Sequence, residues 1–416
     1  MPVTFEDIQK ARELLKGQVV RTPMLRAHKL SEMTGAEVWV KFENQQTTNS
    51  FKDRGAYLRL SKLSEDQKST GVIAMSAGNH AQAVAYHAKR LGIPATIVMP
   101  ETTPFTKVER TKAHGAEVVL AGETLDDSRA VVDNLIAKRG FTLVHPYDDD
   151  DIIAGQGTIA MEMLEDAPDL DMLVIPIGGG GIISGNAISA KTIKPDIQII
   201  GVEAALYPSM YHAVRDAQPK CGGSTLADGI AVKNVAERTI TIAKALVDDI
   251  KLVNEAMIER AVNAYFTELK TCSEGAGATP LAAVFSDPHF FRGKKLGLIL
   301  CGGNIDPRMM ASVIYRELER DQRIVNIRVT IDDRPGVLAR ISAIIGETGA
   351  NILEVAHSRM FLDVSAKGAE LEFMLETRDA GHVEEVADRL EAAGFKVVVL
   401  DAPGGKAHAP HFQQRY

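Results

Sequence analysis

Short apolar runs alternate with amphipathic segments over the first two-thirds of the chain. The predicted strands span residues 38–40, 71–75, 95–99, 117–120, 172–177, 197–202 and 296–300. Between them, apolar positions recur at helical spacing, as in residues 81–91 and 106–113. Thr4, followed three residues later by Asp7, predicts the start of a helix that runs toward Leu15. Nearly continuous apolar strands separated by helices predict an α/β fold with mainly parallel sheets, covered on both faces.

The pattern changes after about Arg323. Apolar and polar residues alternate over residues 325–331, which predicts a half-buried strand. A turn at Asp332–Gly336 and a helical stripe at 337–345 follow, with Gly349 as the C-terminal cap. The remaining predicted elements are a strand at 351–357, a strand at 371–375, a helix at 383–390 and a strand at 395–400. The order βαββαβ predicts a small ferredoxin-like domain.

Composition and charge narrow the class of protein. The chain has 416 residues, 45% hydrophobic and 25% charged, which predicts a globular protein of two or three domains. A net charge of -8 argues against nucleic acid as a partner and against an anionic membrane surface. No apolar run is long enough to span a bilayer, and no secretory signal is visible. Cys221, Cys272 and Cys301 form neither a disulfide framework nor a zinc pattern, so we expect a cytoplasmic protein without bound metal.

Lys52 stands in the sequence SFKDRGA, residues 50–56, just after a predicted strand. Most lysines of this chain are expected to be solvated surface charges. A lysine that is desolvated beside a cofactor has a lowered pKa, and it can act as a nucleophile and then as a base. Lys52 is therefore the candidate to hold an aldehyde cofactor as a Schiff base. Lys41 is a rival, but its position inside a strand favours a structural ion pair.

Four consecutive glycines, Gly178 to Gly181, follow one apolar strand and precede a predicted helix at residues 182–193. Backbone N–H groups at a helix start, unshielded by side chains, form an anion site. The loop is not a Walker loop, because no Gly-Lys-Ser/Thr follows, and it lacks the third glycine of a dinucleotide fingerprint. A tight packing turn is the alternative, but four glycines in a row favour a phosphate site.

Two further polar segments follow predicted strand ends. The segment Ser76–His80 opens a helix, where a hydroxyl, an amide and free N–H groups can bind a carboxylate or simply cap the helix. The segment Cys301–Asn304 follows the strand at 296–300. Open α/β sheets bind ligands at the carboxyl ends of their parallel strands, so we expect these segments to meet at one site. Together with Lys52 and the glycine loop, they point to pyridoxal phosphate.

The motifs SFKDRGA, SAGNHAQ, GGGG and CGGN occur here in the order found in fold-type II pyridoxal-phosphate enzymes. Within that group the chain resembles the threonine/serine dehydratases, also called threonine ammonia-lyases, over residues 5–316. The later segment, with its turn Asp333-Arg334-Pro335-Gly336, resembles an ACT domain, which is a regulatory amino-acid-binding fold. The expected division is a two-lobed catalytic region at 1–323 with its small lobe at about 45–150, an ACT-like domain at 324–401, and a disordered tail at 402–416.

The resemblance implies a role for each matching residue. Lys52 would form the Schiff base, and Phe51 would pack beside the pyridine ring. The other implied cofactor contacts are Asn79 at the phenolic oxygen, Gly178, Gly179, Gly180, Gly181 and the N–H of Ile182 at the phosphate, Glu274 at the ring edge, and Cys301 at the pyridine nitrogen. The substrate carboxylate would lie among Ser76, Ala77, Asn79 and His80.

The implied reaction is dehydration and deamination of a hydroxy amino acid. Lys52 would remove the Cα proton, the β-hydroxyl would leave, and the released product would hydrolyse to a 2-oxo acid and ammonia. L-Threonine would give 2-oxobutyrate, and L-serine would give pyruvate as a secondary activity. A thiol is a weak donor, so Cys301 cannot hold the pyridine nitrogen protonated, which favours loss of the β-hydroxyl over transamination.

Three departures from related proteins bear on this interpretation. Serine racemases that resemble this chain carry a second serine where Ala77 stands, so racemisation is disfavoured. Their divalent-ion site uses an acid at the position of Ser209 in addition to Glu203, so no metal is expected. Asn49 replaces a usual glycine, with little effect expected. A serine or threonine racemase, and a non-catalytic amino-acid sensor on the same scaffold, remain the alternatives.

The ACT-like turn, Asp333 to Gly336, would bind an amino-acid effector, for which isoleucine and valine are the expected candidates. A passive dimerisation module is the alternative. The resemblance also implies a homodimer or homotetramer, and isoleucine biosynthesis as one of two pathways in which such an enzyme acts.

Overall fold

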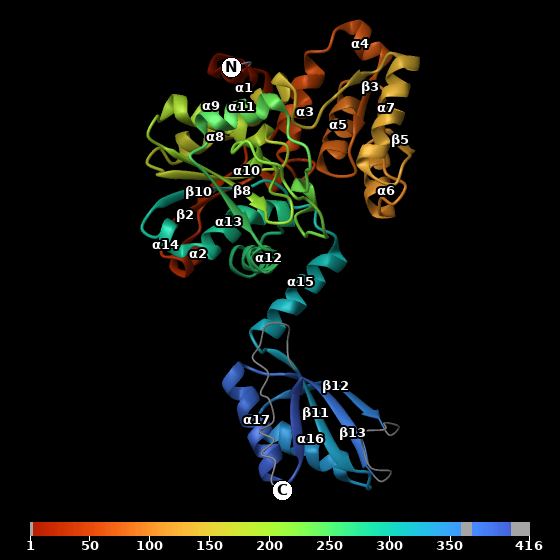
Figure 1. Ribbon diagram of the computed structural model, residues 1–416, viewed down its shortest axis with the longest axis vertical. Helices are drawn as coiled ribbons and strands as arrows, with labels where there is room; N and C mark the ends of the chain where they lie inside the picture. Colours follow the sequence, from red (N-terminus) through yellow and green to blue (C-terminus); the bar gives the residue numbers. More distant parts are fainter. Residues whose placement is uncertain (1–2, 359–367, 401–416) are drawn as a thin grey trace. The chain divides into compact units, whose positions relative to one another are not determined.

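The computed structural model describes residues 3–358 and 368–400 (Figure 1). Its contacts divide the chain into two compact units, Met1–Asp306 and Pro307–Tyr416. The boundary expected at residue 323 differs from this division by helix α15 (Pro307–Arg320), which is grouped with the second unit. The predicted disordered tail, residues 402–416, lies outside the described residues.

The first unit alternates helices and strands along the chain. Its helices are α1 (Phe5–Leu15), α2 (His28–Thr34), η1 (Glu43–Gln45), α3 (Lys52–Ser61), α4 (Glu65–Thr70), α5 (Asn79–Arg90), α6 (Phe105–Ala113), α7 (Leu125–Arg139), α8 (Asp150–Asp166), α9 (Gly181–Ile193), α10 (Ser209–Ala213), η2 (Asp228–Ile230), α11 (Glu237–Leu246), α12 (Glu255–Leu269), α13 (Gly275–Ser286) and α14 (Pro288–Phe291). The predicted start of α1 is confirmed, because Thr4 and Asp7 form a reciprocal capping box. None of the helices in the described residues combines the length and apolarity needed to cross a membrane.

The larger sheet has six strands in the order β1-β2-β10-β7-β8-β9. They are β1 (Met24–Arg26), β2 (Glu37–Phe42), β7 (Met172–Pro176), β8 (Gln198–Ala204), β9 (Asp249–Val253) and β10 (Lys295–Leu300). All neighbours are parallel except β1, which pairs antiparallel with β2. Every residue of β7 is buried, as predicted for a central strand covered on both faces. The pattern missed β1 and β9, because β1 is very short and both are partly exposed edge strands.

The smaller sheet is entirely parallel and has the order β5-β4-β3-β6 (Figure 1). Its strands are β3 (Val72–Met75), β4 (Ala95–Met99), β5 (Glu117–Leu120) and β6 (Thr142–Leu143). Alternate residues of the strands face opposite layers of helices. Ala74 and Ile97 pack in a cluster with residues of α3 and α5, whereas Ile73 and Val98 pack with residues of α7. This three-layer arrangement is the predicted α/β architecture, split over two sheets.

Helices α3, α8 and α9 cross with their backbones almost in contact. A Cβ atom on Gly155 of α8 would lie 2.8 Å from the Cα of Gly55 on α3. A Cβ atom on Gly185 of α9 would lie 2.2 Å from the carbonyl oxygen of Ile153. Only glycine permits such approaches. The crossing brings the first turns of α3 and α9, which carry Lys52 and the glycine loop, to the same helix α8.

The second unit contains the predicted βαββαβ domain. Its elements after α15 are β11 (Ile324–Asp332), α16 (Val337–Glu347), β12 (Asn351–Ser358), β13 (Gly368–Glu376), α17 (Ala380–Ala392) and β14 (Lys396–Leu400). The sheet is antiparallel with the order β12-β13-β11-β14. Ile327, Val329 and Phe373 on the sheet pack with Ile341 of α16 and Leu390 of α17. The buried face of β11 is therefore the one that its alternating pattern predicted.

Candidate active site

Lys52 begins α3, at the end of a loop that is fastened to the carboxyl end of β10. The N–H of Phe51 donates to the carbonyl oxygen of Cys301, and the N–H of Gly303 donates to that of Asn49, each at 3.0 Å. Asn49 has a φ of 57°, in the left-handed region. Glycine adopts this region most easily and asparagine tolerates it, which explains why either residue suits this position.

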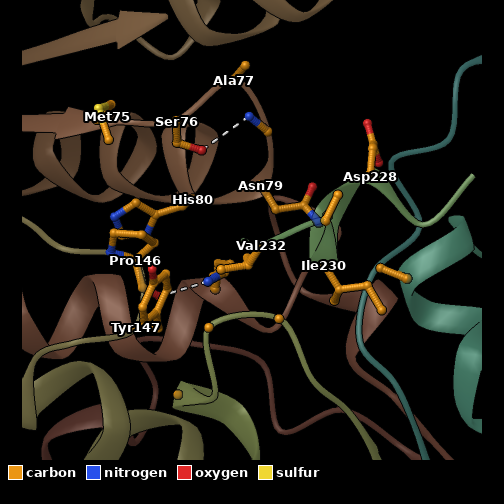
Figure 2. Close-up of a pocket in the computed structure, with 18 of the residues that line it drawn as sticks. Met75, Ser76, Ala77, Asn79, His80, Pro146, Tyr147, Asp228, Ile230 and Val232 are labelled. Atoms are coloured by element: carbon orange, nitrogen blue, oxygen red, sulfur yellow. Dashed lines mark hydrogen bonds between the residues drawn. The ribbon is translucent and has the colours of Figure 1, made fainter. Parts of the chain in front are cut away.

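The Lys52 amine faces a cavity of about 660 Å³ and is otherwise enclosed by protein (Figure 2 shows other residues lining this cavity). Its Nζ donates a hydrogen bond to the carbonyl oxygen of Pro146 at 2.8 Å and lies 5.0 Å from the centre of the Phe51 ring. Burial lowers the pKa of Lys52 to about 8, although Cys301 and Glu274 act in the opposite direction. Roughly a tenth of the amine is therefore neutral at pH 7, far more than for an ordinary lysine.

The glycine loop turns from β7 into α9 beside the cavity. A Cβ atom on Gly179 would lie 2.2 Å from the ring of Tyr147, and Gly180 has a φ of 93°. The Oγ1 of Thr239 donates to the carbonyl oxygen of Gly179 at 2.8 Å and holds the turn. The packing role considered for these glycines is thus confirmed. The same residues leave the first N–H groups of α9 without shielding side chains, which is the form of an anion site.

Asn79 begins α5, and its side-chain amide is held at both ends. The Nδ2 donates to the Oε1 of Glu274 at 2.6 Å, and the Oδ1 accepts from the Nδ2 of Asn304 at 2.9 Å. Burial, and then the charge of Asp228, raise the pKa of Glu274 to about 7. In Figure 2, Asn79 lies on the side of the cavity that carries Asp228 and Ile230. This network fixes the amide at the cavity wall in one orientation.

His80 is fully buried, and its Nε2 lies 2.8 Å from the carbonyl oxygen of Val144. A carbonyl can only accept, so this nitrogen carries the proton. Burial and the charge of Lys52 lower the pKa of His80 to about 3, which leaves a lone pair on Nδ1. The imidazole therefore cannot donate to a carboxylate. The carboxylate contact expected at residues 76–80 would therefore use the N–H groups at the start of α5, the hydroxyl of Ser76 or the amide of Asn79, and not the imidazole.

Cys301 immediately follows strand β10 and is almost completely buried. Burial, and then the charge of Glu274, raise the pKa of its thiol well above the usual value. The side chain is therefore a neutral thiol at physiological pH. A neutral thiol is a weak hydrogen-bond donor, so Cys301 would not keep a pyridine nitrogen protonated.

Arg54, two residues after Lys52, belongs to a separate buried cluster of charges. Its guanidinium contacts the carboxylate of Glu43 at 2.8 Å and that of Glu162 at 2.7 Å. The Nζ of Lys41 contacts the second oxygen of Glu162 at 2.6 Å. Lys41 is thus the structural ion-pair partner that its position in a strand predicted.

The structure brings the predicted residues of the catalytic unit together at one cavity. Its lining includes Phe51, Lys52, Ser76, Ala77, Asn79, His80, Gly178, Gly179, Gly180, Gly181, Ile182, Glu274 and Cys301. The cavity is also lined by residues that the sequence pattern did not predict, namely Pro146 and Tyr147 after β6 and the loop at residues 228–232. Strand β6 is parallel to β3, so its carboxyl end also faces the site, but two residues are too few to show a strand pattern.

Glu203 supports a helix. Its two carboxylate oxygens accept from the N–H groups of Met210 and Tyr211 at 2.8 Å each, at the start of α10. Ser209 is bonded to the carbonyl oxygen of Val232. Over residues 3–358 and 368–400, no group of three or more His, Cys, Asp or Glu side chains is placed to bind a metal ion.

The predicted effector turn, Asp333 to Gly336, lies in the second unit and joins β11 to α16. Gly336 has a φ of 88° and immediately precedes the helix. Arg334 is exposed and lies 3.4 Å from Asp332. The turn is an open surface loop, and its binding of an effector stays a prediction.

The groups around the cavity fit pyridoxal phosphate. The cavity has the size of an ordinary ligand site. It is lined by the enclosed Lys52 amine with its lowered pKa, the unshielded start of α9, the oriented amide of Asn79 and the neutral thiol of Cys301. Residues 15–302 match the family described as "Pyridoxal-phosphate dependent enzyme", and residues 325–395 match the "ACT domain". Fold and site thus define the class, a pyridoxal-phosphate dependent enzyme followed by an ACT domain.

Comparison with single proteins narrows the class further. The chain is 42% identical to the "L-threonine ammonia-lyase" of Thermotoga maritima, over 96% of this chain and all of that protein. It is 40% identical to the enzyme of the same name from Geobacter sulfurreducens, with the same coverage. The structure of "the processed form of threonine deaminase isoform 2 from Solanum lycopersicum" matches with a TM-score of 0.70 and 36% identity, over 74% of this chain and 86% of that one. The chain therefore belongs to the L-threonine ammonia-lyase family.

Proposed function

We propose that the protein converts L-threonine to 2-oxobutyrate and ammonia, with L-serine to pyruvate as a secondary activity. The observation that carries this proposal is the Lys52 amine, which faces the cavity between the glycine loop and Asn79 with its pKa lowered to about 8. The similarity to threonine ammonia-lyases over nearly the whole chain supports the choice of substrate.

Each part of the site has a task that its geometry suits. Pyridoxal phosphate, when bound, supplies an aldehyde that reacts with amines and a ring that withdraws electrons from the substrate Cα. The start of α9 anchors the phosphate, and the start of α5 with Ser76 holds the substrate carboxylate. Neutral Lys52 takes the Cα proton onto Nζ as a general base, which its lowered pKa permits near neutral pH. The Asn79 amide, fixed by Glu274 and Asn304, orients the site.

Substitution of Lys52 tests the proposal directly. The Lys52→Ala protein is expected to lose the visible absorbance of covalently held cofactor and to form no measurable 2-oxo acid from L-threonine. Lys62→Ala is the matched control, because Lys62 follows α3 and pairs at the surface with Asp151. It is expected to keep full turnover. A Lys52→Ala protein with wild-type turnover contradicts the proposal.

Likeness to solved racemase structures favours the racemase alternative. The structure of "maize serine racemase" matches with 32% identity and a TM-score of 0.71, over 77% of this chain and all of that one. Ala77 is among the residues that line the cavity, and its methyl group has no proton to return to Cα. Chiral analysis of serine after incubation separates the two reactions. Appearance of D-serine faster than pyruvate would favour the racemase.

We also propose that the ACT domain binds an amino-acid effector, with isoleucine and valine as candidates, and that the protein is a cytoplasmic homodimer or homotetramer that serves isoleucine synthesis. A variant lacking residues 325–416 is expected to keep threonine turnover and lose any response to isoleucine or valine. An inhibition curve that is unchanged by the deletion contradicts this role. Light scattering of the intact chain measures the oligomeric state.

A further inference from the structure

Gln156 carries two polar atoms at the cavity that have no partner. The residue lies on α8 and is 1% exposed. Neither its Oε1 nor its Nε2 has a hydrogen-bond partner among the described residues. An unpartnered buried amide costs roughly 1–3 kcal/mol in proteins. A group of this kind at a cavity wall indicates that its partner arrives in another state of the protein.

The crossing of α3 and α8 directs this amide to the helix face that carries Lys52. A Cβ atom on Gly55 would lie 2.5 Å from the Nε2 of Gln156. Gly55 comes three residues after Lys52, and residues at this spacing lie on one face of a helix. Gln156 and Lys52 also line the same cavity. The lysine side chain shares both this helix face and this cavity with Gln156, which makes it a candidate partner.

The number of hydrogen-bonding groups supports the same partner. A lysine ammonium has three donors, and in the structure Nζ uses one of them on the carbonyl oxygen of Pro146. Two acceptors that have no hydrogen-bond partner in the described part of the chain line the cavity with it, the Nδ1 of His80 and the Oε1 of Gln156. In Figure 2, His80 lies beside Pro146 at the cavity wall. The three donors of the ammonium thus equal in number the Pro146 carbonyl oxygen and these two acceptors.

We propose that the carbonyl oxygen of Pro146, the Nδ1 of His80 and the Oε1 of Gln156 form an amine recess that holds the Lys52 ammonium during turnover. The inference rests on the proposed function, in which Nζ takes the Cα proton while the electron pair of that bond stays with the substrate. Gln156 is the positioning residue of this recess. The other ionisable groups that act on Lys52 are Cys301 and Glu274, with His80 and His145 held neutral by burial.

Two substitutions of Gln156 test the recess with opposite expected shifts. Gln156→Met keeps the size of the side chain and removes the acceptor, so the ammonium is less stabilised and the pKa of Lys52 falls. Gln156→Glu adds a negative charge, so the pKa rises. In the cofactor-loaded enzyme, the pH at which kcat falls on the acid side should be lower for Gln156→Met and higher for Gln156→Glu. With Met, kcat falls roughly 10- to 100-fold, the value of one hydrogen bond to a charged group, while KM changes little.

A second measurement does not depend on turnover. In the cofactor-free protein, the rate at which acetic anhydride labels Lys52 is followed against pH by mass spectrometry of its peptide. The labelling midpoint shifts down for Gln156→Met and up for Gln156→Glu. Gln198→Glu, an exposed change of the same net charge on β8, is the control and leaves the midpoint in place. Thermal unfolding confirms that each variant is folded.

The outcomes separate this inference from the proposed function. Unchanged labelling midpoints and an unchanged pH profile in both variants overturn the recess, even if threonine turnover by the wild type is normal. A wild type that forms no 2-oxo acid overturns the proposed function and leaves the labelling result to decide the recess. Lower stability of Gln156→Met without any shift in midpoint identifies a structural role only.

Discussion

Lys52 and Arg54 lie two residues apart on the first turn of one helix, and both cations are held inside the protein. Arg54 is fully buried between the carboxylates of Glu43 and Glu162, which raise its pKa above the usual value despite its burial. Lys52 faces the cavity without a contacting carboxylate, and burial lowers its pKa to about 8. Enclosure alone therefore does not decide the chemistry of a buried cation.

The difference between the two residues is one of partners. A paired charge is stabilised and inert, and it fastens α3 to η1 and α8. A charge without an opposite partner is destabilised, and it can lose its proton near neutral pH and react. The same helix turn thus carries one residue that holds the fold and one that is available for chemistry.

The largest stability effect is expected when the paired charge is removed. Arg54→Met leaves Glu43 and Glu162 buried without their guanidinium, so the free energy of unfolding should fall by about 3–5 kcal/mol. Urea unfolding of the cofactor-free protein measures this loss. Arg54→Lys keeps the charge without the two-sided contact and should lose less. If Arg54→Met lost less than about 1 kcal/mol, Arg54 would not be a stabilising buried ion pair, and the contrast with the unpaired Lys52 would not hold.

Lys52→Met is expected to have the opposite sign. Removal of an unpaired charge should stabilise the cofactor-free protein at pH 7 by up to about 3 kcal/mol. This upper limit is the lowering of the Lys52 pKa converted to free energy, and screening by water in the cavity reduces it. The same urea experiment measures this gain. Lys62→Met serves as the surface control and should change stability by no more than about 0.5 kcal/mol. Destabilisation by Lys52→Met would show that the amine is paired after all.

The pH dependence of that gain sharpens the comparison. The unfolded chain binds a proton at Lys52 up to its ordinary pKa of 10.5, whereas the folded protein releases it at about 8. Burial of the charged amine therefore lowers the free energy of unfolding by its full amount below pH 8, and this cost disappears as the pH rises toward 10.5. The stability of the wild type should increase across this window relative to that of Lys52→Met. Unfolding at a series of pH values measures the difference. A difference that stays constant from pH 7 to 10 contradicts the assignment.

The smallest effect concerns the loop that presents Lys52. Asn49→Ala places an ordinary side chain in the left-handed region and should cost roughly 1 kcal/mol of stability, with a lower kcat as the loop shifts. Asn49→Gly should match the wild type within about 0.5 kcal/mol, because glycine adopts this conformation freely. Thermal unfolding and threonine turnover check both. Equal behaviour of the two variants would mean that the loop is not strained here.

Hydrophobic periodicity by itself determined most of the elements and the class of fold. The central strands, such as β7, are apolar throughout, and β11 alternates strictly, so their burial follows from local sequence. The motifs at the strand ends also identified the site, because parallel strands deliver their carboxyl ends to one edge. Lys52, Asn79, the glycine loop and Cys301 could be found in this way.

Only the tertiary structure decided what surrounds these residues. The very short strand β6 places Pro146 and Tyr147 at the cavity, and the glycine contacts between α3 and α8 place Gln156 there. Neither feature produces a periodic pattern in the sequence. The proton position on His80 likewise depends on the carbonyl oxygen of Val144, which is distant in sequence. Sequence pattern reports which side chains avoid water. Hydrogen-bond partners and pKa values depend on contacts between distant segments, so they appear only when the chain is folded.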